Sequence, residues 1–258
     1  MKNILLPLLV LLICSCERTI AQEKATTDFF KEISQYDMSL VWTADKYYGV
    51  WLEGEEWVGR GFLFGFIGDD YQRFYIHVIS AIKIPGKENE YQLYGKTRVK
   101  NNICEFQGIA TIVDAKVTRS DVVRGYYSGY ALSDIVLYED NKQLSTGVIR
   151  GKMTSYFMLN SKGFFGYNGL HYISDNFTNN QFKGTWTSYK TGQSKRCHWG
   201  DYRIPDSGDL DIGAGEFSVN EIYRNSGWDS CYNMFMNDAE TDAGKKARLE
   251  EDRQWWKE

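Results

Sequence analysis

Residues 74–84 read Phe-Tyr-Ile-His-Val-Ile-Ser-Ala-Ile-Lys-Ile, and this stretch decides the fold. The alternate positions from Phe74 to Ile84 are nearly all apolar, whereas the positions between them mix polar and apolar side chains. Successive side chains of a β-strand point to opposite faces of a sheet. The pattern therefore predicts a strand with one face turned toward a core.

The next two segments have the same period and form a predicted hairpin. In residues 91–100 one face is mainly apolar, and the opposite face is polar and largely basic. This polar stripe consists of Gln92, Tyr94, Lys96, Arg98 and Lys100. Asn101-Asn102 is a tight-turn pair that leads into a second apolar strand from Cys104 to Ile112. We interpret the stripe as a solvated outer face, with binding of an anionic partner as the alternative.

Segments of period two, separated by turns, continue through most of the chain. The further strands are predicted at about 47–52, 57–67, 126–138, 145–158 and 182–189. Glycines such as Gly95 and Gly108 interrupt strand interiors, as a tightly bent sheet requires. The sequence thus predicts a mainly β protein in which roughly eight strands form an antiparallel up-and-down barrel or strongly curved sheet, rather than a two-sheet sandwich.

Short helices are predicted at both ends of this sheet. Thr27 or Asp28 can cap a helix that runs to about Tyr36. Asp238 can cap a last helix, in which Leu249 and Trp256 share one face. Between the sheet and this helix, from about residue 190, the chain is rich in turn formers, acids and aromatic residues. The terminal pair Trp255-Trp256 is expected to dock on its own domain.

Two tripeptides carry a resemblance to a known family. Gly49-Val50-Trp51 and Gly184-Thr185-Trp186 resemble the Gly-x-Trp that opens lipocalin-type barrels. The resemblance is confined to these two tripeptides and assigns no superfamily.

Composition and the first residues indicate where the protein works. The chain has 258 residues and a net charge of -4, so it lacks the basic surface that a nucleic-acid partner requires. Residues 1–15 combine Lys2 with an apolar run that is too short to span a bilayer, which is typical of a signal peptide. Ile13-Cys14-Ser15-Cys16 resembles the bacterial lipobox, and this resemblance implies that Cys16 receives the lipid.

The mature chain is expected to begin with a lipidated tether, residues 16–25, followed by a single β-rich domain at 26–258. The alternative is ordinary signal-peptidase cleavage after Ala21. Glu17 resembles the acidic export signal of some outer-membrane lipoproteins, so we expect an outer-membrane protein that faces the periplasm or the exterior. The membrane is then a partner through the lipid anchor.

Three cysteines remain after Cys16: Cys104, Cys197 and Cys231. An oxidising compartment favours a disulfide, and Cys197 with Cys231 is the predicted pair because both lie in the turn-rich tail. Cys104 falls on the apolar face of a predicted strand, where a small buried hydrophobe is expected.

The acidic loop at 201–216 is the best candidate site for chemistry. Its carboxylates suggest either a calcium site or the acid pair of a carbohydrate hydrolase, with solvated turn carboxylates as the simplest interpretation. Aromatic neighbours could stack on a sugar, although in a β-rich domain such residues are usually core. The candidate binding residues are Trp199, Asp201, Tyr202, Asp209, Asp211, Glu216 and Trp228.

No motif in the sequence identifies catalytic residues, a metal site or a cofactor. The three histidines, His77, His171 and His198, lack the spacing of metal ligands. There is no G-x-S-x-G nucleophile motif and no glycine-rich phosphate loop. We therefore expect a lipid-anchored envelope protein that binds a protein or a glycan without catalysis. The alternatives are a carbohydrate hydrolase that uses loop 201–216, an immunity-type lipoprotein that neutralises a basic toxin, and a structural component of the envelope.

Overall fold

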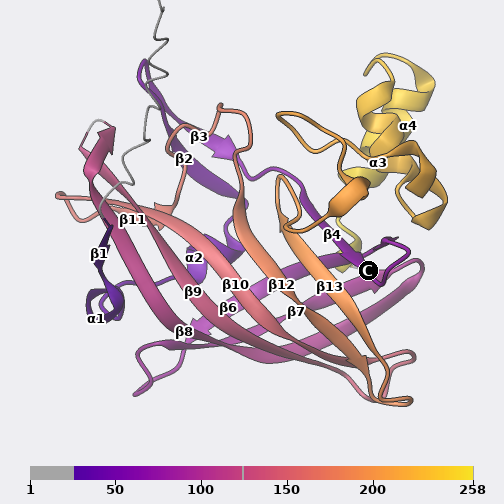
Figure 1. Cartoon of the computed structure of the whole chain (residues 1–258), viewed down its shortest axis with the longest axis horizontal. Helices are drawn as coiled ribbons and strands as arrows, with labels where there is room; N and C mark the ends of the chain where they lie inside the picture. The colour runs from indigo at the N-terminus through magenta and orange to yellow at the C-terminus, as the bar shows by residue number, and fades with distance from the viewer. Residues whose placement is uncertain (1–25, 124, 258) are drawn as a thin grey trace, which may run out of the picture.

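The fold is a strongly curled antiparallel sheet that forms a half-barrel, as Figure 1 shows for the computed structural model. The structure describes residues 26–123 and 125–257; the predicted signal peptide, Cys16 and the tether lie outside the described residues. This architecture confirms the prediction of a mainly β protein with an up-and-down, strongly curved sheet. Period-two alternation therefore identified the fold class correctly.

A meander forms the centre of the sheet, and each long strand pairs with the next one along the chain. These strands are β6 (Tyr75–Lys83), β7 (Glu90–Val99), β8 (Asn102–Val123), β9 (Tyr126–Glu139), β10 (Gly147–Asn160), β12 (Asn179–Ser188) and β13 (Ser194–Asp201). Beyond β13 the sheet continues through two earlier strands, β4 (Leu63–Ile67) and β5 (Gln72–Arg73). The sheet thus returns toward its own first long strand.

The remaining short strands lie at the margins of the half-barrel. β1 (Thr26–Asp28) pairs with β8, and β11 (Phe165–Tyr167) pairs with the end of β10. β2 (Lys46–Val50) and β3 (Glu55–Gly59) form a separate hairpin. The predicted strand 57–67 is therefore wrong as a single element, since it is divided between β3 and β4. The division lies at Arg60, whose side chain leaves the hairpin to pair with a buried aspartate.

A β-bulge in β6 changes which side chains of the opening sequence face the core. The pairing with β7 shifts between Val78 and Ser80, so the two faces exchange after this point. Ile76 is buried as predicted, but Ile82 is 61% exposed. Lys83 instead points inward and donates hydrogen bonds to the carbonyls of Ser34 and Tyr36. Strict alternation predicted the strand but not the bulge.

The hollow of the half-barrel is filled by the segment that precedes β2. This segment contains the short helices α1 (Phe30–Ile33) and α2 (Ser39–Thr43), and α2 lies within the curve of the sheet in Figure 1. Trp42 is buried there, and its indole nitrogen donates to Ser155 Oγ at 2.9 Å. The predicted helix from Thr27 or Asp28 to Tyr36 is thus shorter, because Thr27 and Asp28 belong to β1.

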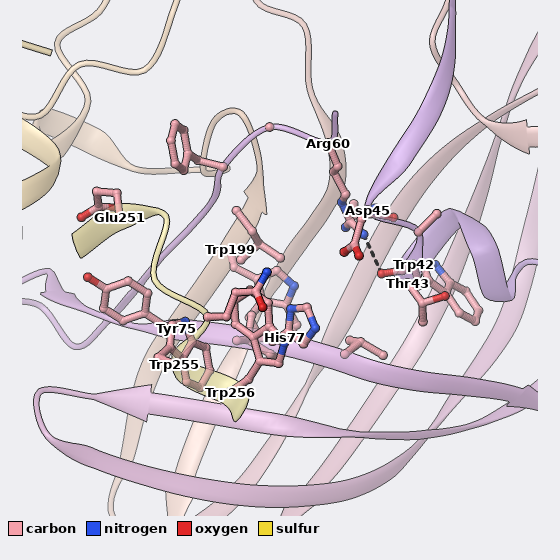
Figure 2. Close-up of a pocket in the computed structure, with 18 of the residues that line it drawn as sticks. Trp42, Thr43, Asp45, Arg60, Tyr75, His77, Trp199, Glu251, Trp255 and Trp256 are labelled. Carbon is pink, nitrogen blue, oxygen red and sulfur yellow. Dashed lines mark hydrogen bonds between the residues drawn. The ribbon is translucent and has the colours of Figure 1, made fainter. Parts of the chain in front are cut away.

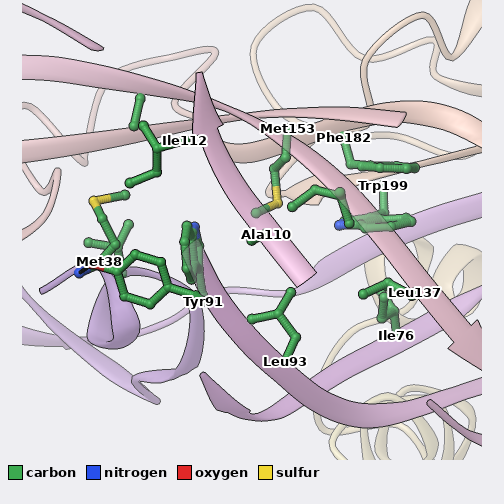
Figure 3. Close-up of a cluster of buried hydrophobic side chains, with 14 of the residues drawn as sticks. Met38, Ile76, Tyr91, Leu93, Ala110, Ile112, Leu137, Met153, Phe182 and Trp199 are labelled. Atoms are coloured by element: carbon green, nitrogen blue, oxygen red, sulfur yellow. Dashed lines mark hydrogen bonds between the residues drawn. The ribbon is translucent and has the colours of Figure 1, made fainter. Parts of the chain in front are cut away.

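The main core lies between these helices and the concave face of the sheet. Figure 3 shows part of it, from Met38 and Tyr91 at one end to Phe182 and Trp199 at the other. Phe182 and Trp199 stack with ring centroids 3.6 Å apart. Their strands β12 and β13 are neighbours, so this contact helps to hold the second half of the sheet together.

The C-terminal part packs on the convex face of β4. Phe64 and Phe66 point to this side and form a second cluster with Phe217 and Trp228. Several short helices follow the sheet: η1 (Gly208–Leu210), η2 (Glu221–Ser226), α3 (Asp229–Met236), α4 (Asp242–Glu251) and η3 (Trp255–Lys257). None of the helices in the described residues is long and apolar enough to cross a membrane.

The last α-helix differs from the prediction in the residue that caps it and in the side chains that it buries. Thr241, rather than Asp238, caps α4 by accepting a hydrogen bond from the backbone nitrogen of Gly244. Leu249 is 74% exposed, so it does not share a buried face with Trp256. The expected docking of the terminal tryptophans is confirmed, because Trp255 is buried and Trp256 stacks on His77.

Docking of this tail also corrects the interpretation of the basic stripe on β7. Arg98, predicted as part of a solvated outer face, is only 6% exposed. Its guanidinium lies over Tyr75 at 4.0 Å from the ring centroid and pairs with Glu250 of α4 at 3.5 Å. The outer face of β7 is thus covered here by a segment more than 150 residues away in sequence, which local alternation could not indicate.

Close approach of neighbouring strands explains the glycines inside them. Gly108 of β8 lies opposite Leu137 of β9, and a Cβ atom added at Gly108 would collide with the carbonyl oxygen of Val136. Gly59 of β3 is different, since a Cβ atom there would meet no heavy atom within 4 Å. The predicted link between interior glycines and tight strand contacts therefore holds at Gly108, whereas Gly59 at the end of β3 has open space beside it.

We expect Gly108→Ala to destabilise the protein by about 1–3 kcal/mol, because the added methyl group must push β8 and β9 apart. Gly59→Ala is the matched control and is expected to change stability by less than about 0.5 kcal/mol. Urea unfolding of the two variants measures both values. Equal stability of Gly108→Ala and the natural protein would show that the strands are not in close contact there.

Candidate functional site

A cavity of about 460 Å³ lies in the open side of the half-barrel. Its walls come from the end of α2, the chain entering β4, the start of β6, the floor of the sheet and the C-terminal tail. These segments are far apart in sequence, and Figure 2 shows their side chains converging on one space. We call this space the mouth cavity. Its volume lies in the usual range for sites that bind small molecules.

Aromatic side chains form much of the wall. Tyr75, Trp255 and Trp256 gather on one side, as Figure 2 shows, and Trp42 lies on the other with Trp199 between them. The His77 ring stacks on Trp256 with centroids 3.9 Å apart and planes 11° apart. The mouth cavity therefore offers broad apolar surfaces, of the kind on which planar or ring-shaped ligands pack.

A buried ion pair supports the wall beneath Trp42. Asp201 is fully buried, and its Oδ1 lies 2.9 Å from Nη2 of Arg60. The same carboxylate accepts hydrogen bonds from the Tyr167 hydroxyl at 3.1 Å and the Asn180 amide at 2.8 Å. Arg60 also donates to the Trp42 carbonyl at 2.7 Å, so the pair fixes the end of α2 against the sheet. A buried pair with this many partners holds the wall in position, and removal of either partner would strongly lower the stability of the fold.

The imidazole of His77 is neutral at pH 7. Burial is the largest cause, and together with the positive charge of Arg60 it lowers the pKa of His77 to about 4. Asp45 opposes this shift without reversing it. A neutral ring has one donor nitrogen and one acceptor nitrogen. His77 therefore adds a polar, uncharged group to the aromatic wall.

Asn180 carries an unused acceptor in the same wall. This residue is 2% exposed and adopts a positive φ of 47°, which non-glycine residues adopt rarely. Its amide nitrogen donates to Asp201 and to the Val41 carbonyl, but its Oδ1 has no hydrogen-bond partner. Buried polar atoms without partners are uncommon, and they are often satisfied by a bound molecule or water. Asn180 thus places an unsatisfied polar atom just beneath the surface of the wall.

The charges of the wall are largely balanced within the protein. Arg60 pairs with Asp201, and Arg73 pairs with Glu251 at 3.1 Å with both side chains almost completely buried. Arg73 also lies over the Trp228 ring at 4.1 Å. Exposed carboxylates of the wall, such as Asp45, stand at its rim. The mouth cavity therefore has no strong positive field for an anion.

The predicted binding residues do not form one site. Trp199 lines the mouth cavity, and Asp201 lies behind its wall in the buried ion pair. Tyr202 is close to this pair, with its hydroxyl 2.7 Å from that of Tyr47. Trp228 belongs to the second hydrophobic cluster on the convex side of β4. Of these four residues, only Trp199 faces the space where a ligand could enter.

The acids of loop 201–216 mainly organise the loop itself. Asp211 pairs with Arg203 at 2.7 Å and accepts hydrogen bonds from the backbone nitrogens of Gly213 in the loop and Ser218 just after it. Asp209 is exposed and accepts from the Tyr223 hydroxyl, and Glu216 is exposed. No group of three metal-ligating side chains with suitable geometry occurs in residues 26–123 and 125–257. The geometry of the loop therefore favours turn carboxylates over a calcium site or a catalytic pair.

The predicted disulfide between Cys197 and Cys231 is wrong. Both residues, and Cys104 as well, are free and buried. Cys197 packs in the main core on the concave side of the sheet, whereas Cys231 in α3 packs in the cluster on the convex side of β4. The sheet separates the two sulfur atoms, which nearness in sequence did not indicate. The buried position of Cys104 is as predicted.

Sequence reasoning missed most of the mouth cavity. Tyr75 and His77 were assigned to the face of β6 opposite the core, and the tail that covers this face creates the site. Arg60 had one local signal, since it is a charged residue between two glycines, Gly59 and Gly61. For Asp45 and Asn180, the surrounding sequence contained no signal of a role in the cavity. Comparisons of the chain with protein-family models, with curated proteins and with solved structures find no match.

We expect His77 to make the protein less stable in acid. Its pKa is about 4 in the folded chain and 6.5 as a free side chain, so between these pH values the unfolded chain binds more protons. Stability contributed by neutral His77 is complete above pH 6.5 and is lost as the pH falls toward 4. His77→Phe keeps an aromatic ring on Trp256 and should lose less stability between pH 7 and pH 4.5. Thermal unfolding at both pH values tests this; parallel losses in the two proteins would contradict the assignment.

Proposed function

We propose that this protein is a lipid-anchored binding protein of a bacterial cell envelope, which holds a short, uncharged glycan in the mouth cavity and releases it unchanged. The observation that carries the proposal is the convergence of aromatic surfaces and polar side chains on one cavity. Function is argued from this site because a β-rich fold alone does not specify a ligand.

The chemistry of the wall favours a sugar over other small molecules. Sugar rings present apolar C–H faces that pack on tryptophan, and hydroxyl groups that both donate and accept hydrogen bonds. His77 can donate to a hydroxyl or accept from one, and Asp45 at the rim can accept. A purely apolar ligand would leave these groups unsatisfied. An anionic ligand would meet carboxylates at the rim.

The location in the envelope rests on the sequence. The lipobox-like Ile13-Cys14-Ser15-Cys16 supports a lipid anchor at Cys16, followed by a tether of about ten residues. With an acidic residue directly after the anchor, the outer membrane is the proposed location, and the domain would face the periplasm or the exterior.

The other functional hypotheses have less support from the geometry. A hydrolase at loop 201–216 needs two accessible carboxyl groups across a sugar. Asp201 and Asp211 are buried and bound to arginines. Asp209 and Glu216 are exposed, but neither lines the mouth cavity, where the aromatic surfaces lie. A toxin-neutralising role would need an acidic surface for a basic partner, and a structural role would need none of the features of the mouth cavity. Both stay predictions that a search for a protein partner can test.

We expect Trp256→Ala to weaken glycan binding by up to about tenfold, because one stacking surface of the wall is lost. Trp57→Ala is the matched control, since Trp57 is 68% exposed on β3 and lies outside the cavity. Calorimetric titration with cellobiose, chitobiose and maltose measures the affinities. Absence of binding to every saccharide, or an equal loss in both variants, would refute the proposed site.

We expect Cys16→Ser to abolish incorporation of a labelled fatty acid and to release the protein from membranes. Cys14→Ser is the matched control and should keep both properties, because the lipobox resemblance assigns the lipid to the second cysteine. The measurement is gel autoradiography together with fractionation of cells that express each variant. A labelled Cys16→Ser protein would place the anchor elsewhere.

A further inference from the structure

A second cavity of about 310 Å³ lies among the hairpin turns of the half-barrel and shares no lining residue with the mouth cavity. We call it the turn cavity. Its deep side consists of neighbouring strand positions, with Thr97 opposite Cys104 on β7 and β8, Glu139 at the end of β9, and Trp186 on β12. Ile67, Phe74 and Val99 make the rest of the wall largely apolar.

Glu139 is a buried carboxylate without a cationic partner. It is 5% exposed, and its oxygens accept hydrogen bonds from the Thr97 hydroxyl, the Trp186 indole nitrogen and the backbone nitrogen of Gly147. All three donors are neutral, and no ion pair of Glu139 occurs in the part of the chain that the structure describes. A buried charge without a counter-charge is costly. Burial accordingly raises the pKa of Glu139.

The hydrogen bonds alone do not require a glutamate at this position. A glutamine oxygen could accept from Trp186 and Gly147, and its amide nitrogen could donate to the Thr97 oxygen. Glutamine would do so without the cost of burying a charge. The carboxylate therefore needs another reason, and in a cavity wall that reason is a positive group brought by a ligand.

The rim of the turn cavity carries the opposite charge. Lys100 lies in the turn between β7 and β8, and Lys195 lies on β13 directly opposite Trp186 in the strand pairing. Both side chains are exposed and form no ion pair with another described residue. Asp70 is the one acidic residue of the rim, which leaves the rim with net positive charge. A ligand that enters thus meets positive charge first and negative charge at depth.

We infer that the turn cavity is a second binding site, which takes a zwitterion of dipeptide size with its ammonium group at Glu139 and its carboxylate between Lys100 and Lys195. The apolar wall accommodates an apolar side chain of this ligand. A simple amine would lack the group that suits the two lysines, and a simple carboxylate would leave Glu139 unpaired. Only a molecule with both charges, separated by several bonds, complements the whole cavity.

Cys104 does not make the site a covalent one. Burial raises the pKa of this thiol to about 11, with the nearby Glu139 as a smaller cause, so the sulfur stays protonated at neutral pH. Its sulfur already accepts a hydrogen bond from the Asn102 amide at 3.1 Å. The inferred event is reversible binding.

The first test is a titration with alanyl-phenylalanine, followed by NMR and calorimetry. We expect binding, and a loss of about tenfold or more on N-acetylation or on C-terminal amidation, since each change removes one charge-assisted contact. Phenylalanine alone carries both charges on one carbon and should bind more weakly. Absence of binding of the free dipeptide, or equal binding of the blocked forms, would overturn the inference.

Variants locate the site. The Glu139→Gln variant should bind the free and the N-acetylated dipeptide with about equally low affinity. The double variant Lys100→Gln/Lys195→Gln should lower the affinity for the free dipeptide, and because both lysines are exposed this variant should still fold. Trp256 lines the mouth cavity and not the turn cavity, so Trp256→Ala should leave the affinity for the dipeptide unchanged. A failure of glycan binding at the mouth cavity therefore does not bear on dipeptide binding at the turn cavity. Natural affinity in Glu139→Gln, or an equal loss in Trp256→Ala, would place the ligand elsewhere.

Thermal unfolding gives a readout that needs no ligand. Glu139→Gln should raise the melting temperature at pH 7, because it removes an unpaired buried charge. This gain should shrink as the pH falls toward 4.5, because the carboxyl group of the natural protein then becomes protonated in the folded and the unfolded chain. Glu88→Gln removes an exposed carboxylate as a matched control and should leave the midpoint unchanged. A lower midpoint for Glu139→Gln at pH 7 would mean that the carboxylate stabilises the fold, and the inference would fail.

Discussion

The sheet curls far enough to bring its two ends together but does not pair them as strands. β4 and β6 approach each other, and the backbone nitrogen of Phe74 donates to the Gly65 carbonyl where the chain passes from β5 into β6. The unpaired edges must still be covered, because exposed strand edges invite unwanted pairing. Here α2 covers the inner side and the C-terminal tail the outer side, and the space left between them is the mouth cavity. The main candidate site therefore follows from incomplete closure.

The sequence predicted what depends on local periodicity and missed what depends on distant contacts. Alternation located the meander and its hairpins, and glycine placement indicated tight strand contacts at Gly108. The burial of Arg98 and the pairing of Arg60 where the 57–67 strand divides involve partners far away in the chain. The bulge in β6 leaves no mark in the alternation of the sequence. Candidate residues chosen for their density in loop 201–216 proved to have separate partners: Asp201 pairs with Arg60, Asp211 pairs with Arg203, and Asp209 accepts from Tyr223.

Two buried carboxylates have different roles because their neighbours differ: one supports a cavity wall, and the other is inferred to bind a ligand. Asp201 has an arginine and further donors around it, so its charge is compensated inside the protein and it positions the wall of the mouth cavity. Glu139 has neutral donors only and faces an open space. Composition counts these residues as equivalent acids. The difference lies entirely in which neighbours the fold brings to each carboxylate.

The pairing of β13 with β4 has a consequence for how the chain reaches its native state. The meander joins neighbours in sequence, so its hairpins can form early. Cys197 of β13, in contrast, pairs with Ile67 of β4, and the two residues are 130 positions apart (197 − 67) in the chain. Contacts of such high sequence separation form slowly, since a long loop must close before they contribute. Docking of the last strands is therefore expected to limit the folding rate. A ligand of the mouth cavity can bind only after this step, so it would slow unfolding without accelerating folding.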